Sequence, residues 1–151
     1  MINLITNVTI ISTNLNRKIL DNYKDYKVIN DNFTYDELLN NKKVIFFNVL
    51  SNLNKDDINR LYTFLKTNNI YFINITNNME EVLFTDKLII YDSEKVVAEG
   101  NTIELLKNEK LIKRLGFNLP FIVELSILLK DYGLVNQLYL DKESLVGELW
   151  K

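Results

Sequence analysis

The chain has 151 residues, 47% of them hydrophobic and 25% charged, which favours one compact globular domain. The formal net charge is −2 and the sequence pI is about 5.2, so no overall basic field could attract nucleic acid or an anionic membrane. The chain has no cysteine and no histidine, which excludes disulfides, thiolate chemistry and a histidine base or metal ligand.

The amino-terminal stretch 1–11 is interrupted by polar residues and lacks a basic segment, so we expect no signal peptide there. No apolar run approaches the roughly 20 residues that a membrane-spanning helix needs. We therefore expect a cytoplasmic protein without direct membrane insertion. We also expect no metal and no cofactor.

Strand and helix patterns alternate through the first two thirds of the chain. Apolar or β-branched runs predict strands at 8–11, 26–29, 43–47, 70–73 and 88–91. Helical spacing and capping residues predict helices at 16–23, 33–39, 54–67 and 79–83. The run Lys43–Phe47 has no polar interruption after its first residue, so we expect it inside a parallel sheet with both faces covered.

The remainder begins with an edge hairpin and continues as helices. Residues 92–94 are predicted to form a turn into a strand at 95–98. Short helices are predicted at 102–107, 110–115 and 144–149. A longer helix is predicted to have Pro120 in its first turn and to end at Gly133. The predicted fold class is α/β, with three layers and a mostly parallel sheet. Residues 1–100 form the predicted core, and residues 101–151 form a helical C-terminal extension packed on it.

The order of short motifs from residue 42 onward resembles that of an ABC-type ATPase. In chain order, the similar segments are the Walker B strand (42–48), the D-loop (51–56), the switch strand and loop (71–81) and the closing hairpin (85–92 and 95–102). Residues 116–125 are similar to a stretch in ATPases of energy-coupling-factor (ECF) transporters, whose C-terminal extension helps to pair two ATPase subunits. The resemblance covers roughly residues 42–130. It implies a reduced P-loop NTPase core that lacks the glutamine loop, the helical subdomain and the signature motif.

The residues that this resemblance assigns to ATP chemistry have been replaced. Ser12–Ile19 stands in the place of the Walker A phosphate loop, yet the first glycine of the chain is Gly100. Such loops hold phosphate with closely approaching backbone N–H groups, which a Cβ on every residue obstructs. Within this segment Lys18 is a vestigial phosphate-facing cation, although a solvated helix lysine is the favoured interpretation.

The Walker B carboxylates and the switch histidine are also missing. The resemblance places them at Asn48, Val49 and Asn77, none of which supplies a charged Mg²⁺ ligand or polarises an attacking water. We therefore predict that the chain does not hydrolyse ATP.

Acidic side chains elsewhere have simpler interpretations. The pairs Asp56–Asp57 and Glu80–Glu81 fall in first helical turns, so helix capping is favoured over acid–base catalysis. Four carboxylates surround the predicted hairpin and could gather a cation, but a solvated edge is favoured for them: Asp86, Asp92, Glu94 and Glu99.

One apolar stripe in the extension is the candidate interface. It comprises Pro120, Phe121, Glu124, Leu125 and Leu128, and packing of these residues against the sheet is an equal alternative. The first functional hypothesis is a pseudo-ATPase that associates with an ABC- or ECF-type ATPase, or with itself as a dimer, and is peripheral to the membrane through a transporter complex. A nucleotide or small-ligand sensor without hydrolysis is the alternative. A third hypothesis is an unrelated small α/β enzyme, for which the sequence offers no strong base.

Overall fold

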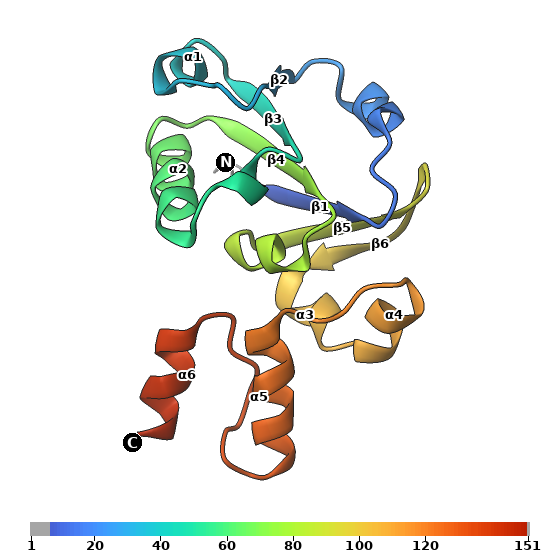
Figure 1. Cartoon of the computed structure of the whole chain (residues 1–151), viewed down its shortest axis with the longest axis vertical. Helices are drawn as coiled ribbons and strands as arrows, with labels where there is room; N and C mark the ends of the chain where they lie inside the picture. The colour runs from blue at the N-terminus through green and yellow to red at the C-terminus, as the bar shows by residue number, and fades with distance from the viewer. Residues whose placement is uncertain (1–6, 151) are drawn as a thin grey trace, which may run out of the picture.

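The computed structural model describes residues 7–150. Residues 1–6, which belong to the stretch expected to lack a signal peptide, and Lys151 lie outside that range. A six-stranded sheet in the order β2-β3-β4-β1-β5-β6 forms the centre of the molecule (Figure 1). Its strands are β1 (Val8–Ser12), β2 (Lys27–Ile29), β3 (Lys43–Phe47), β4 (Tyr71–Thr76), β5 (Lys87–Asp92) and β6 (Lys95–Asn101).

Five strands run parallel, and β6 pairs antiparallel with β5 at one edge. The predicted α/β class, the mostly parallel sheet and the edge hairpin are therefore confirmed. The α-helices are α1 (Tyr35–Leu39), α2 (Lys55–Thr67), α3 (Thr102–Leu106), α4 (Glu109–Arg114), α5 (Phe121–Asp131) and α6 (Lys142–Leu149). Three short 3-10 helices are η1 (Arg17–Tyr23), η2 (Leu50–Asn52) and η3 (Met79–Phe84).

Polar side chains at helix starts explain why these segments are helical. An N-cap side chain accepts a hydrogen bond from a backbone N–H of the first turn, which would otherwise lack a partner. The residues that do so are Asn16, Thr34, Asn54, Asn78, Asn101, Asn108 and Asp141. Five of these seven residues are asparagines, whose side chains therefore serve the backbone. Pro120 is the N-cap of α5 and not a first-turn residue, which corrects the predicted position.

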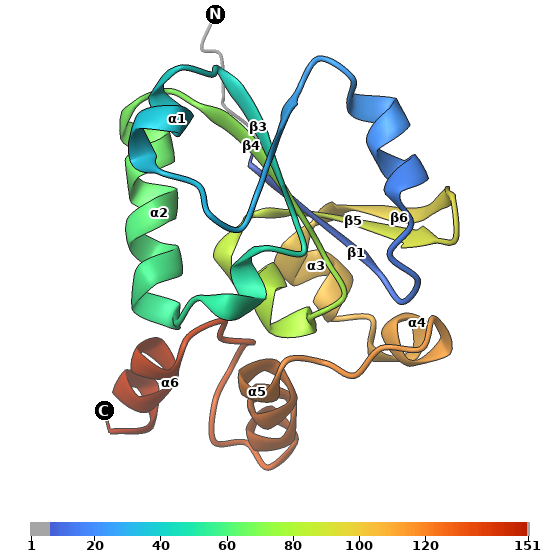
Figure 2. The same ribbon diagram turned by 45° about the horizontal axis from the view of Figure 1, so that its top comes forward.

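The sheet is covered on both faces, which gives three layers. On one face α2 packs over β2, β3 and β4 through a cluster that includes Leu61, Leu65 and Phe72. On the opposite face η1 packs over Ile10, Ile75 and other residues of a separate cluster. Figure 2 shows α2 and η1 on either side of the sheet.

The C-terminal helices share a core with the sheet. Ile11 and Leu88 of the strands lie in one buried cluster with Leu106 of α3, Ile112 of α4 and Val123 of α5. Within residues 7–150, the extension therefore packs directly on β1 and β5. This packing places α5 and α6 side by side at one end of the molecule, close to the amino end of α2 (Figures 1 and 2).

Candidate functional site

Three segments tied to ATP chemistry by resemblance leave the same edge of the sheet. Strand β4 lies between β3 and β1, with Phe47 opposite Ile75 and Ile11 opposite Thr76. Because these strands are parallel, their carboxyl ends meet at one edge, where open α/β sheets usually bind ligands. The segments that follow β1, β3 and β4 are therefore neighbours, and we call this region the carboxyl edge.

At the end of β3, the backbone of Asn48 and the side chain of Val49 both have structural roles. Asn48 has a φ of 54°, a left-handed conformation that asparagine tolerates better than most residues. Its backbone N–H donates to the carbonyl of Ile75 at 2.7 Å, which extends the pairing of β3 with β4. Val49 is buried in the cluster beneath α2. A valine side chain packed in this core has no group that could act on water.

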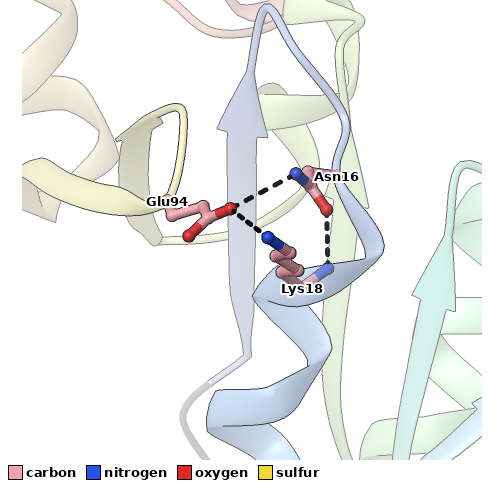
Figure 3. A network of polar contacts seen from close by, with 3 residues as sticks. All are labelled: Asn16, Lys18 and Glu94. Carbon is pink, nitrogen blue, oxygen red and sulfur yellow. Dashed lines mark hydrogen bonds and ion pairs between the residues drawn. The ribbon is translucent and has the colours of Figure 1, made fainter.

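The segment after β1 turns its lysine toward the edge hairpin (Figure 3). Lys18 Nζ lies 3.3 Å from Glu94 Oε1, and Asn16 Nδ2 donates to the same oxygen at 3.5 Å. Asn16 Oδ1 also accepts from the backbone N–H of Lys18, which caps η1. Because Lys18 and Glu94 are both largely exposed, this geometry agrees with the interpretation of Lys18 as a surface lysine.

After β4, Asn77 is exposed and a buried glutamate lies close by. Glu81 is only 3% exposed, and its two carboxylate oxygens accept from different side chains. Asn74 Nδ2 donates to Oε1 at 2.9 Å, and Thr76 Oγ1 donates to Oε2 at 2.7 Å. The capping interpretation is therefore wrong for Glu81, because its side chain joins η3 to β4.

The sequence contained a signal for this network that we missed. Asn74 and Thr76 alternate with isoleucines in an otherwise apolar strand, and a buried polar side chain in such a strand needs a partner. The nearest carboxylates along the chain are Glu80 and Glu81. The predicted strand therefore ended too early at residue 73, whereas β4 continues to Thr76.

A buried tyrosine lies next to this network. Burial raises the pKa of the Tyr62 hydroxyl, and the nearby Glu81 carboxylate raises it further, while Asn74 acts in the opposite direction. The interaction with Asn74 is weak, since neither the Tyr62 hydroxyl nor Asn74 Oδ1 makes a hydrogen bond of good geometry. Tyr62 therefore keeps its proton, and its ring packs on Phe72 with centroids 4.4 Å apart.

The candidate interface residues differ in exposure. Phe121 is 70% exposed and Leu128 is 51% exposed, while Glu124 is exposed and Leu125 is half-buried. Pro120 is buried, so its side chain is not on the outer face, which corrects that assignment. The buried residues of α5 are Val123 and Ser126. The outer apolar stripe continues along the chain to two more exposed residues, Tyr132 and Leu134.

A carboxylate connects η3 to the start of α5. The N-cap Pro120 has no side chain that could accept from the first turn, and the backbone N–H of Phe121 donates to Glu80 Oε2 at 3.2 Å. Glu80 therefore caps a helix 41 positions away in sequence. The two adjacent glutamates join η3 to different neighbours, Glu81 to β4 and Glu80 to α5.

A cavity of about 810 Å³ lies between the core and the last two helices, and we call it the α5/α6 groove. Its apolar lining comes from η2, α2, η3, α5, α6 and the connections next to them. These residues are Leu50, Leu53, Ile58, Leu83, Phe84, Phe121, Ile122, Leu125, Leu140, Leu145, Val146 and Leu149. Ser51 and Asn78 also line it, so the groove reaches the segments that follow β3 and β4. At one end, Lys55 of α2 lies 3.6 Å from Glu143 of α6.

Two features are absent from the described part of the chain, a cluster of metal ligands and a membrane-spanning helix. Among residues 7–150, no three or more acidic side chains are grouped so that they could hold a metal ion, and this includes the carboxylates around the β5–β6 hairpin. Within the same residues, no helix combines the length and apolar character that crossing a membrane requires.

Comparison with known proteins reveals partial relatives. The ECF transporter ATP-binding protein EcfA1 of Bacillus subtilis is 39% identical over 79 residues, which are 52% of this chain and 28% of the relative. The corresponding protein of Ureaplasma parvum is 31% identical over 116 residues, 74% of this chain and 40% of the relative. No known family profile matches the chain.

Among solved structures, CbiO1 of Clostridium perfringens, part of the ABC transporter complex CbiONQ, is similar with a TM-score of 0.38 and 19% identity. The alignment covers 49% of this chain and 32% of that one. The chain spans about a third of the length of the curated relatives that it matches. Over half or more of its own length, the chain is thus related in sequence to the ATP-binding proteins of ECF transporters, which confirms the resemblance of its motifs.

Proposed function

We propose that the chain is a non-catalytic relative of the ABC ATPases that acts by associating with another protein. The partner is an intact ATPase of the ECF type or a second copy of this chain. The observation that carries the proposal is Val49, which is buried in the core where the resemblance assigns a catalytic carboxylate. Valine cannot polarise water, and its burial leaves no room for a chemical role at that position.

The other positions support the same conclusion. An amide at Asn48 lacks the negative charge that holds Mg²⁺, and the segment after β1 has a Cβ on every residue. Lys18, which the resemblance assigns as the vestigial cation of that segment, pairs with Glu94 at 3.3 Å. Since phosphoryl transfer depends on positioning and on charge stabilisation, a site without these groups has no means to accelerate it.

Association is supported by the outer face of α5. Phe121, Leu125, Leu128 and Tyr132 recur at helical spacing, and three of them are largely exposed. Scattered exposed apolar residues are ordinary, but a continuous stripe on one helix is typical of a protein interaction surface. The chain resembles ECF ATPases, in which the C-terminal extension helps to pair two ATPase subunits. The same region is therefore the candidate interaction surface of this chain.

Sedimentation velocity over a concentration series, alone and mixed with an intact ECF ATPase of the same host, tests association. We expect a complex in at least one series, and a tenfold or greater loss of affinity in Leu128→Glu. Leu39→Glu is the matched control because Leu39 on α1 is 52% exposed, close to the 51% of Leu128. A chain that stays monomeric in both series contradicts the association.

Phosphate release from Mg²⁺-ATP tests the absence of catalysis, and we expect none above the rate without protein. Turnover that follows the protein through purification contradicts this part of the proposal. A rise in melting temperature at millimolar ATP without turnover favours the ligand-sensor alternative, because a ligand stabilises the folded state that binds it.

A further inference from the structure

The α5/α6 groove is continuous with exposed apolar surface. Its floor is formed by buried residues such as Leu50, Ile58 and Leu145. At its margins, Phe121, Val146 and Leu149 line the groove and are also exposed to solvent. Phe121 also belongs to the outer apolar stripe of α5, which continues beyond the groove to Leu128. An occupant that covers both the groove and this stripe is the size of a protein segment.

The elements around the groove favour a helical segment. Every lining residue within the described chain comes from a helix or the connection next to one, and none comes from a strand. An extended peptide would therefore find no strand edge to supply backbone hydrogen bonds. A helix satisfies its own backbone groups and needs only apolar contacts at spacings of three and four residues.

The charges around the groove favour a positively charged flank on that helix. Five acidic residues and two lysines are among the lining residues: Asp56, Glu80, Glu81, Asp141 and Glu143, with Lys55 and Lys142. Glu81 is buried and bonded to β4, and Glu143 is paired with Lys55. Of the other three carboxylates, Glu80 accepts from the backbone N–H of Phe121 and Asp141 accepts from Ser144, while Asp56 is exposed. Because these hydrogen bonds leave the carboxylates charged and Lys142 is the one other lysine among the described lining residues, the rim is acidic and complements Lys or Arg on a partner.

We propose that the α5/α6 groove receives an amphipathic helix of a partner protein, with its apolar face on the groove floor and basic residues along its flanks. This inference rests on the proposed association and specifies the chemistry of the partner. The groove overlaps the outer stripe of α5 at Phe121 and Leu125, whereas Leu128 lies on the stripe and does not line the groove.

Two synthetic 18-residue peptides without tryptophan can serve as probes. Both carry leucine at positions spaced by three and four, with lysine at all other positions in one peptide and glutamate in the other. Trp150 is the single tryptophan of the chain and follows the groove residue Leu149, so its fluorescence can report binding. We expect saturable one-to-one binding of the lysine peptide and at least tenfold weaker binding of the glutamate peptide.

Val146→Arg tests the location of binding, with Val97→Arg on β6 as its matched control. The two valines are 38% and 43% exposed, so neither change disturbs a buried side chain. We expect at least a tenfold loss of lysine-peptide affinity in Val146→Arg and less than a twofold change in Val97→Arg. Equal binding to both variants would mean adventitious adhesion of the peptide and would overturn the proposal.

Asp56→Asn tests the charge of the rim, with Asp36→Asn as its control. Both aspartates are exposed in the first turn of a helix, but only Asp56 lines the groove. We expect a two- to fivefold loss of affinity in Asp56→Asn alone.

The outcomes also distinguish this inference from the proposed function. If Val146→Arg abolishes self-association while wild-type protein ignores the lysine peptide, a second copy occupies the groove and the inference fails, while the proposed association stands. If the protein has no partner in sedimentation yet binds the lysine peptide through the groove, the proposed association fails and the groove chemistry stands.

Discussion

The carboxyl edge and the outer face of α5 differ in whether their side chains have partners within the chain. At the carboxyl edge, the buried carboxylate of Glu81 accepts hydrogen bonds from the buried side chains of Asn74 and Thr76. On the outer face of α5, large apolar side chains such as Phe121 and Leu128 remain in contact with water. The hydrogen bonds of the first region stabilise the fold of the chain itself. The second leaves apolar surface whose burial could stabilise a complex.

Removal of the Glu81 side chain should have the largest effect, and it tests whether the buried network at the carboxyl edge stabilises the fold. We expect Glu81→Ala to destabilise the fold by about 3 kcal/mol, because two buried donors lose their acceptor and a cavity remains. Urea unfolding measures the change. Glu80→Ala is the neighbouring control and should cost about 1 kcal/mol or less, since the Glu80 carboxylate is exposed and caps only the start of α5. Equal losses in the two variants would contradict the distinction between them.

Substitutions of Asn48 test whether this position, which the resemblance assigns to the Walker B motif, is occupied by asparagine because of its left-handed backbone conformation. We expect Asn48→Ala to cost about 1 kcal/mol, because alanine is strained at a φ of 54°, and Asn48→Gly to be nearly neutral. Asn69→Ala provides a comparison outside the carboxyl edge, because Asn69 has a φ of 55° and should show a similar loss. Thermal or urea unfolding distinguishes these cases. A loss in Asn48→Gly as large as in Asn48→Ala would point to a role for the side chain itself.

Tyr62 provides a test that depends on pH. Burial raises its pKa in the folded state above the value of about 10 in the unfolded chain, so the folded protein keeps a proton that the unfolded chain releases. Its contribution to stability is complete below pH 10 and declines as the pH rises above that value. We expect Tyr62→Phe to make alkaline unfolding less steep between pH 10 and 12. Little difference from wild type is expected at pH 7, where the tyrosine is neutral in both states.

The elements of the fold could largely be predicted from the sequence, because apolar runs and helix caps are local signals. The buried network could not, since the partner of Asn74 comes from the following helix and not from its own strand. The orientation of α5 was ambiguous for a similar reason. Its outer stripe has the helical spacing of a core face, whereas the buried residues are Val123 and Ser126. Only the packing of α5 on the sheet decides which of the two stripes is covered.

The smallest expected effect concerns the ion pair between Lys18 and Glu94. Both side chains are more than half exposed, so the pair contributes less than about 0.5 kcal/mol, and Glu94→Gln should barely change urea unfolding. The variant is informative because it also frees the vestigial cation of the segment after β1. If a neutralised lysine were all that prevents nucleotide binding, Glu94→Gln would gain a melting-temperature shift with ATP that wild type lacks. We expect no such gain, because the surrounding segment still has no glycine through which its backbone could approach a phosphate.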